Sequence, residues 1–277
     1  MVSETDKPGH SAAPQSSCSS SPQPKSEAGT QFDYEAIPAG YYDQVMRQGN
    51  PIRRLWHVSK FERVIDYLPS APEQSILDIG CFAGTFLSLL PKERFSRQLG
   101  VDILPAQIDY ANRTYGSSFR SFRHVPSITH LRTIEGRFDC VTLIEVIEHL
   151  QPSEIRDLVA ELARLIRPGG KLVLTTPNYA SSWPILEQIL NRLSEVSYEE
   201  QHITRFTYFN MERRLSSLYP ALDEQFVLDL KTTTHFITPF LAGLSYEWAR
   251  GLSRLVPHTS WRNPFGNLVL MVLTRRG

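Results

Sequence analysis

Two carboxylates and an imidazole that could act together follow one apolar strand in this sequence. Phe138 to Leu150 reads FDCVTLIEVIEHL, in which the apolar run Val141 to Ile144 predicts a buried strand. Glu145 ends that strand, and Glu148 and His149 follow three and four residues later. If a helical turn begins at Glu145, the three side chains share one face of it.

From the residues alone, two interpretations are open. In the first, the acids offset the dipole of a helix that starts here, and His149 packs against the sheet. In the second, His149 is a general base, because an unperturbed imidazole pKa of about 6.5 suits the removal of a proton from a hydroxyl group. The second interpretation requires a ligand-binding edge, which an open α/β sheet has at the carboxyl ends of its strands.

The stretch that must build this edge is Ser75 to Leu90, which reads SILDIGCFAGTFLSLL. An apolar run that contains Asp78 is followed by Gly80 and Gly84 and then by an apolar periodic segment, so a strand, a tight turn and a helix are predicted. Glycines let the backbone approach a ligand closely, and the start of the helix directs its N–H groups at that ligand. We therefore expect a nucleotide-type cofactor here, with Cys81 a small residue beside it rather than a nucleophile.

A second acid supports the cofactor site. Gln98 to Ile103 reads QLGVDI and predicts the next buried strand, at whose end Asp102 can accept hydrogen bonds from both hydroxyls of a ribose. Ile103 follows Asp102 and is expected to contact the cofactor as well. Because such an acid also suits NAD, Asp102 does not by itself select the cofactor.

The turn from Asp78 to Gly84 has the pattern D-x-G-x-x-x-G and resembles the first motif of the class I S-adenosylmethionine (SAM) methyltransferases. That motif is an acid-x-Gly-x-Gly-x-Gly turn, and Phe82 stands where the family has its central glycine. The resemblance covers about Phe32 to Arg275. It implies an α/β, Rossmann-like fold with a mostly parallel seven-stranded sheet, helices on both faces and helical insertions. It also implies SAM as the cofactor, and the residues that would contact it are Asp78, Gly80, Cys81, Gly84, Asp102, Ile103 and Glu145.

Two groups of this superfamily share an E-x-x-E-H motif at this strand end and a later histidine. They are the ubiquinone-biosynthesis O-methyltransferases, which the chain resembles in particular, and the small-RNA terminal 2′-O-methyltransferases. Glu145 to His149 matches the motif in full, and His202 in EEQHITRF lies where the later histidine would be. The resemblance therefore implies a divalent cation such as Mg²⁺ that holds the acceptor oxygens. Its ligands would be Glu145, Glu148, His149 and His202.

One part of the family pattern is missing. Residues 119–134, after the third predicted strand, contain no acid to meet the adenine amino group, so we expect backbone groups and apolar packing to hold the adenine. Helical segments are predicted on both sides of Gly49 to Pro51. Within them, Arg53, Arg54 or His57 could reach the methionine carboxylate of SAM.

Composition and periodicity predict the organisation of the 277 residues. Residues 1–31 form a Ser- and Pro-rich tail predicted to be disordered, and residues 32–277 form the methyltransferase domain. Within this domain, the turn Arg167 to Gly170 is predicted to cap the preceding helix. Insertions at about 179–205 and 235–263 carry apolar helical stripes that suit a hydrophobic acceptor or a membrane surface. Strands are predicted at 75–79, 98–103, 118–122, 138–144, 171–176, 226–233 and 267–274.

Charge and cysteine content limit the partners and the compartment. The net charge is zero, which disfavours a nucleic-acid partner. The three cysteines form no C-x-x-C pair, so reduced thiols and a cytoplasmic location are expected. No apolar run reaches the roughly 20 residues that a spanning helix needs, although peripheral contact with a membrane stays open.

The function predicted from these observations is SAM-dependent methyl transfer to an oxygen of a small or lipid-like hydrophobic acceptor, with His149 as the catalytic residue. Two alternatives are open: terminal 2′-O-methylation of small RNA, and a SAM-binding regulatory subunit without turnover. The sequence does not predict an oligomeric state.

Overall fold

The computed structural model of the chain describes residues 37–193, 202–255 and 264–277. The predicted tail at 1–31 lies outside the described residues, as do residues 194–201 and 256–263 of the two predicted insertions.

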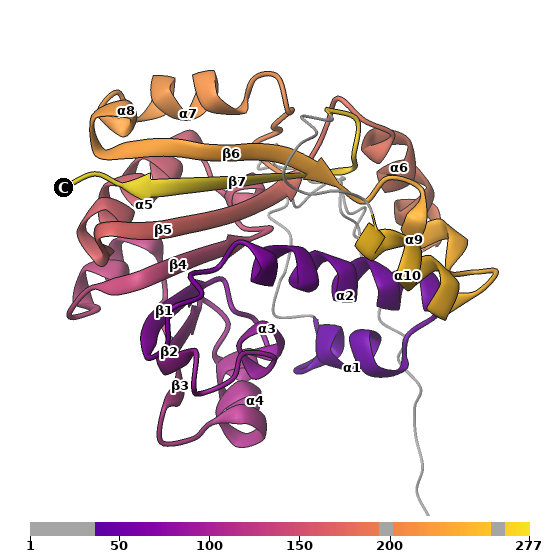
Figure 1. Ribbon diagram of the computed structural model, residues 1–277, viewed down its shortest axis with the longest axis horizontal. Helices are drawn as coiled ribbons and strands as arrows, with labels where there is room; N and C mark the ends of the chain where they lie inside the picture. Colours follow the sequence, from indigo (N-terminus) through magenta and orange to yellow (C-terminus); the bar gives the residue numbers. More distant parts are fainter. Residues whose placement is uncertain (1–36, 194–201, 256–263) are drawn as a thin grey trace, which may run out of the picture. The chain divides into compact units, whose positions relative to one another are not determined.

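Seven strands form one sheet in the order β3-β2-β1-β4-β5-β7-β6 (Figure 1). The strands from β3 to β5 are parallel, whereas β7 runs antiparallel to both of its neighbours. The predicted seven-stranded, mostly parallel sheet with an antiparallel final pair is confirmed. The strands are β1 (Gln74–Ile79), β2 (Phe95–Asp102), β3 (Arg120–His124), β4 (Phe138–Ile144), β5 (Ile166–Pro177), β6 (Phe226–Thr234) and β7 (Leu268–Arg275).

The strand order reverses between β1 and β4. From β1 the chain moves outward through β2 to β3, then returns to place β4 on the other side of β1. At such a reversal the connections that follow the two neighbouring strands leave in opposite directions, and ligands bind in the crevice between them. The sequence placed Asp78 on β1 and the Glu145 to His149 motif after β4, so both predicted groups lie at this reversal.

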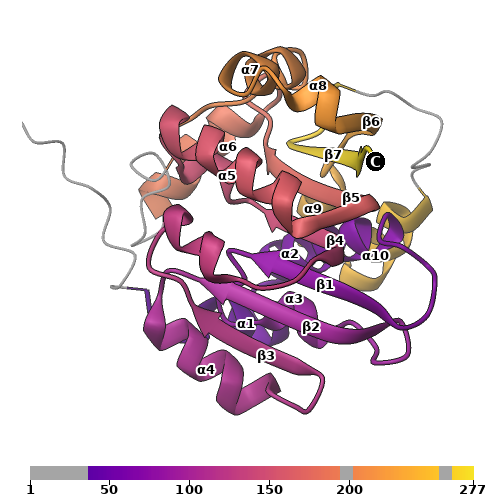
Figure 2. The same ribbon diagram turned by 90° about the vertical axis from the view of Figure 1, so that its left-hand side faces the viewer.

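Helices cover both faces of the sheet. Neighbouring residues of a strand point to opposite faces, so each strand contributes to two cores. Ile76 contributes to a core with the residues of α2 (Pro51–Asp66), α3 (Thr85–Ser88) and α4 (Pro105–Tyr115). Its neighbour Leu77 contributes to a core with η2 (Ile128–Thr133), α5 (Pro152–Leu165), α7 (Met211–Leu218) and α8 (Leu222–Gln225). Figure 2 shows α5 and α2 on opposite sides of the sheet.

The first two helices meet at the predicted break. α1 (Tyr41–Gln48) ends before Gly49, and α2 begins at Pro51. Asn50 caps α2, since its side chain accepts a hydrogen bond of 3.0 Å from the backbone N–H of Arg53.

The insertions form α6 (Trp183–Leu193) after β5, and α9 (Thr238–Leu241) and α10 (Tyr246–Leu255) after β6. Leu55 of α2 forms a small apolar core with Ala242 and Ala249, so the second insertion packs on α2.

The predicted glycine cap of α5 is wrong. The helix ends at Leu165, and Ile166 is already extended, with φ −90° and ψ 134°, and pairs with Phe138 of β4. The turn from Arg167 to Gly170 is therefore an irregular first part of β5, in which Gly169 has φ 77°. Pairing with β4 satisfies backbone groups that a cap would otherwise have to satisfy.

Candidate active site

Asp78 is a buried residue near the carboxyl end of β1. Its carboxylate accepts a hydrogen bond of 2.6 Å from the hydroxyl of Thr142 on β4. Burial raises the pKa of Asp78 to about 7, and the negative charge of Asp102 adds to this, while the Thr142 hydrogen bond opposes it. The two predicted acids therefore lie close enough to influence each other's charge.

In the turn after β1, neighbouring side chains pack directly against the backbone of the two glycines. Gly80 has φ 77° and Gly84 has φ 76°, both in the left-handed region. A Cβ on Gly80 would lie 2.4 Å from Cγ2 of Val146, and one on Gly84 would lie 2.5 Å from the ring of Phe122. Neither position has room for a side chain.

Phe82 holds a left-handed backbone conformation although it is not glycine. Its φ is 46°, in a region that glycine adopts without strain and that other residues adopt rarely. The backbone N–H of Phe82 donates a 2.8 Å hydrogen bond to the Asp102 carboxylate, and its ring packs edge-on against Tyr42 at 5.0 Å. These two contacts offset the strain of the departure.

Asp102, the last residue of β2, accepts a hydrogen bond from the turn after β1. Besides Phe82, it accepts a 2.9 Å hydrogen bond from the N–H of Leu104. Burial raises its pKa, although the backbone hydrogen bonds oppose this. Ile103 beside it is exposed.

Burial raises the pKa of the Cys81 thiol well above its ordinary value, which agrees with a packing role for Cys81.

Glu145 is turned away from the other two residues of its motif. It has φ 55°, and the following turn η3 (Ile147–His149) begins only after Val146. The single helical turn considered from the sequence therefore does not start at Glu145. Its carboxylate forms an ion pair with Lys60 of α2, a residue without any signal in the sequence patterns. Burial would raise the pKa of Glu145, but the charge and hydrogen bond of Lys60 outweigh this, and the pKa is lowered.

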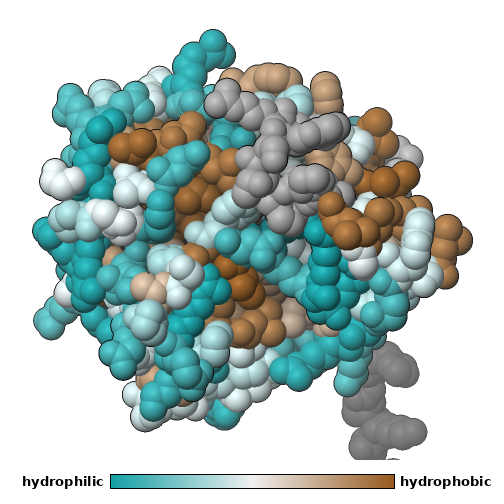
Figure 3. Space-filling view, viewed as in Figure 1, coloured by the Kyte–Doolittle hydropathy of each residue, from teal (hydrophilic) through white to brown (hydrophobic). Residues whose placement is uncertain are grey.

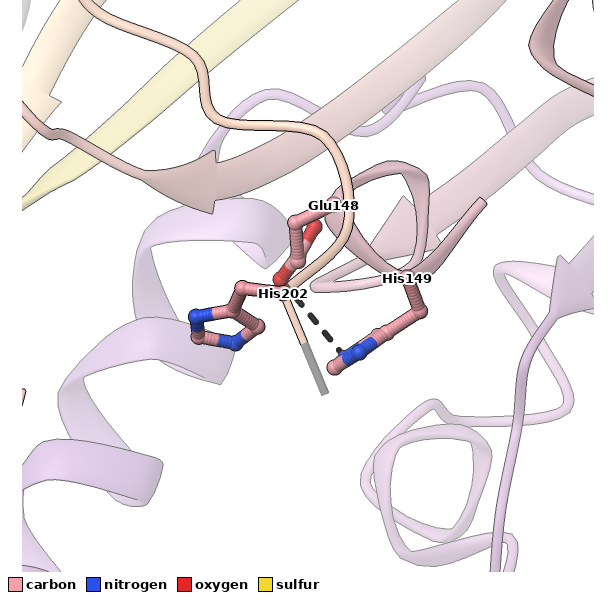
Figure 4. A group of neighbouring side chains, drawn as sticks. All are labelled: Glu148, His149 and His202. Atoms are coloured by element: carbon pink, nitrogen blue, oxygen red, sulfur yellow. Dashed lines mark ion pairs between the residues drawn. The ribbon is translucent and has the colours of Figure 1, made fainter. Parts of the chain in front are cut away.

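Glu148, His149 and His202 do come together (Figure 4). Each offers one potential ligand atom, and these three atoms lie within 4.8 Å of one another. Glu148 is fully buried: Oε2 accepts a 3.0 Å hydrogen bond from Thr176, whereas Oε1 has no hydrogen-bond partner in the described part of the chain. Oε1 lies 4.0 Å from Nε2 of His149. Burial raises the pKa of Glu148 to about 7, although the nearby His202 opposes this.

A second carboxylate orients His202. Glu187 of α6 lies 2.6 Å from Nδ1 of His202, and the Tyr179 hydroxyl lies 2.8 Å from the same atom. Burial would raise the pKa of Glu187, but hydrogen bonds from His202 and Tyr179 lower it, so Glu187 is a carboxylate that accepts from Nδ1–H. This arrangement leaves the lone pair on Nε2 of His202, as in histidines that bind metals. No pattern in the sequence selects Glu187.

The donor set fits a divalent cation. One buried carboxylate oxygen lacks a partner, and two imidazoles lie within coordinating reach of it. Glu145, the fourth predicted ligand, lies with Lys60 instead.

A doubly wound sheet with a glycine turn after β1, an acid at the end of β2 and an acid–histidine motif after β4 defines a class I methyltransferase. Residues 53–218 match the family model of the methyltransferase domain, and the chain belongs to that family. The predicted superfamily is therefore confirmed, and SAM is the cofactor of this class.

Curated relatives and solved structures agree on the fold. The tRNA N(3)-methylcytidine methyltransferase trm140 of Schizosaccharomyces pombe is 31% identical over 50% of this chain and 50% of its own length. A ubiquinone biosynthesis O-methyltransferase of Pseudomonas aeruginosa is 27% identical over 52% of this chain and 61% of its own length. The N-methyltransferase NodS of Bradyrhizobium japonicum, solved with S-adenosyl-L-homocysteine, covers 88% of this chain and 95% of its own, with a TM-score of 0.53 and 16% identity. The chain thus spans about half the length of the curated relatives that it matches.

Proposed function

We propose that this SAM-dependent methyltransferase transfers the methyl group to an oxygen of a small or lipid-like hydrophobic acceptor. The observation that carries the proposal is the group of Glu148, His149 and His202 just beyond β4, in which one buried carboxylate oxygen lacks a partner. It follows the strand that pairs with β1, so the group lies at the same sheet edge as the cofactor turn.

Each residue of the group has a separate part in the proposal. A divalent cation bound here would lower the pKa of the acceptor hydroxyl and orient it. Glu148 and His202 would hold the cation, their side chains fixed by Thr176 and Glu187. The side chain of His149 is 24% exposed while that of Glu148 is fully buried, so we assign removal of the acceptor proton to His149.

An aromatic wall beside this group supports a hydrophobic acceptor. The rings of Trp56 and Trp183 lie 5.4 Å apart, and that of Trp183 lies 6.1 Å from His202. His235 continues the row at 4.5 Å from Trp56. The wall thus joins α2 and both insertions to the histidines, and flat apolar groups pack well against such rings.

RNA is the competing acceptor. The tRNA methyltransferase among the relatives supports it, and the zero net charge disfavours it. A regulatory subunit without turnover is the remaining alternative, and a lack of transfer to every acceptor would favour it.

Transfer of label from SAM to a cell extract, separated into lipid, small-molecule and RNA fractions, tests the proposal. We expect label in the lipid or small-molecule fraction, and a loss of at least about tenfold on chelation or in Glu148→Gln, which removes the ligand charge. Asp157→Asn, an exposed acid on α5, is the control and should retain activity. Label in RNA would overturn the proposed acceptor, and label that survives chelation would remove the cation but leave His149 as a base.

A further inference from the structure

A partly buried ion pair lies directly beside the cofactor turn. Lys60 is 4% exposed, and its ammonium meets the carboxylate of Glu145. The residue after Glu145, Val146, packs so closely on Gly80 that no Cβ fits between them. The pair therefore borders the part of the turn that a cofactor would approach.

Helix α2 follows the turn on the side that carries Lys60. His57, one turn before Lys60, packs against Tyr42 at 5.4 Å, and Tyr42 packs against Phe82 of the turn. Phe61, next to Lys60, lies 5.3 Å from Phe86 at the start of the following helix. Because residues three and four apart share a helix face, these contacts place Lys60 along the turn.

The three basic residues considered from the sequence are less suited to hold a carboxylate. Arg53 donates a 3.1 Å hydrogen bond to the Tyr41 hydroxyl, and Arg54 stacks on Tyr246 at 4.5 Å. Burial and the charge of Lys60 lower the pKa of His57 to about 3, so its imidazole is neutral. Lys60 is the buried cation beside the turn.

We propose that Lys60 and Glu145 bind the amino-acid end of SAM, Lys60 its carboxylate and Glu145 its α-ammonium group. That end is a zwitterion, and an adjacent lysine and carboxylate match its two charges. An ammonium has three donor hydrogens and a carboxylate has two acceptor oxygens, so each member of the pair can form further hydrogen bonds to the zwitterion. Glu145 also holds a left-handed backbone conformation, a strain that occurs mostly at functional sites. The assignment rests on the proposed cofactor but not on the acceptor.

Two ligands that differ only in the carboxylate test Lys60: SAM and decarboxylated SAM. Calorimetry without any acceptor should show that Lys60→Met weakens SAM binding by roughly 10- to 100-fold, as expected for one lost charge-assisted hydrogen bond. Binding of decarboxylated SAM should not weaken. Lys171→Met is the matched control, because it breaks the ion pair with Asp229, which is not part of the group around the cofactor turn.

Equal losses for the two ligands, or none for SAM, would overturn the role of Lys60. If Lys60→Met does not fold because Glu145 is left unpaired, the double variant Lys60→Met, Glu145→Gln removes both charges. That variant should bind S-adenosylhomocysteine no better than it binds 5′-methylthioadenosine, a thioether of the same charge at sulfur that lacks the amino-acid end, and a retained preference for S-adenosylhomocysteine contradicts the proposal. If the wild type binds none of these ligands, the cofactor itself is wrong, which is a different result from failure of Lys60.

Discussion

Asp78 is a buried acid whose carboxyl group is about half ionised near pH 7. Its pKa of about 7 in the folded protein stands well above the ordinary value of 3.8 that it regains on unfolding. Between these two pH values the folded state binds more protons than the unfolded state. The contribution of Asp78 to the free energy of unfolding is therefore fully present at low pH and is lost as the pH rises toward 7.

Asp78→Asn should remove this dependence on pH, since the amide does not ionise. Relative to the wild type, the variant should gain unfolding free energy from about pH 4 to about pH 7, by as much as several kcal/mol. Urea unfolding followed by circular dichroism across this range measures the difference. Asp109→Asn, an exposed residue of α4, should follow the wild type at every pH. Parallel profiles for wild type and Asp78→Asn would refute the raised pKa.

At the scale of elements, the turn and short helix α3 depend on close packing rather than on helix length. α3 is only four residues long and begins after Gly84 in the left-handed conformation. A helix this short is not stable alone, so its position comes from contacts such as that between Gly84 and the ring of Phe122.

Gly84→Ala should therefore destabilise the protein by about 1–3 kcal/mol, because the methyl group meets Phe122 and φ is unfavourable. Gly251→Ala in α10 is the matched substitution, with nothing within 4 Å of its new Cβ. It should stabilise the protein by up to about 1 kcal/mol through helix propensity. Thermal unfolding of the two variants gives the comparison, and an unchanged or raised stability of Gly84→Ala would show that the turn tolerates a side chain.

At the scale of the whole molecule, apolar side chains gather on the second insertion. Figure 3 shows hydrophobic residues over α9 and α10. Leu244 is 85% exposed, Trp248 59% and Ile237 62%. In the described residues, no helix is both long enough and apolar enough to cross a membrane. Such a surface suits shallow contact with lipid, which would also supply a lipid-like acceptor.

The double variant Leu244→Ser, Trp248→Ser should reduce binding to phosphatidylcholine vesicles by roughly 10- to 100-fold, from the apolar area that no longer enters the lipid. Cosedimentation measures this, and Leu89→Ser, which is exposed beside α3, is the control. If the wild type does not sediment with vesicles, or if both variants lose binding alike, this surface does not contact membranes.

Residue patterns were enough to predict the sheet and most of the residues at its edge. Apolar runs marked the central strands β1, β4 and β5, since burial on both faces requires such runs, whereas β3 has a single buried residue. Asp78, Asp102 and the motif from Glu145 to His149 follow from position alone, because parallel strands end at one edge. His202 was selected by resemblance rather than by spacing, and the structure places it beside Glu148 and His149.

The ion-pair and hydrogen-bond partners of the site residues could be found only from the tertiary structure. Lys60 and Glu145 are 85 residues apart, and no periodicity shows that α2 would pack with that side chain toward β4. Glu187 orients His202 only because α6 folds back beside it. The direction of the Glu145 side chain depends on the positive φ of that residue. Glutamate adopts a positive φ only where the surrounding packing compels it. Local patterns record burial and turns, whereas ion pairs between distant segments depend on how whole elements pack.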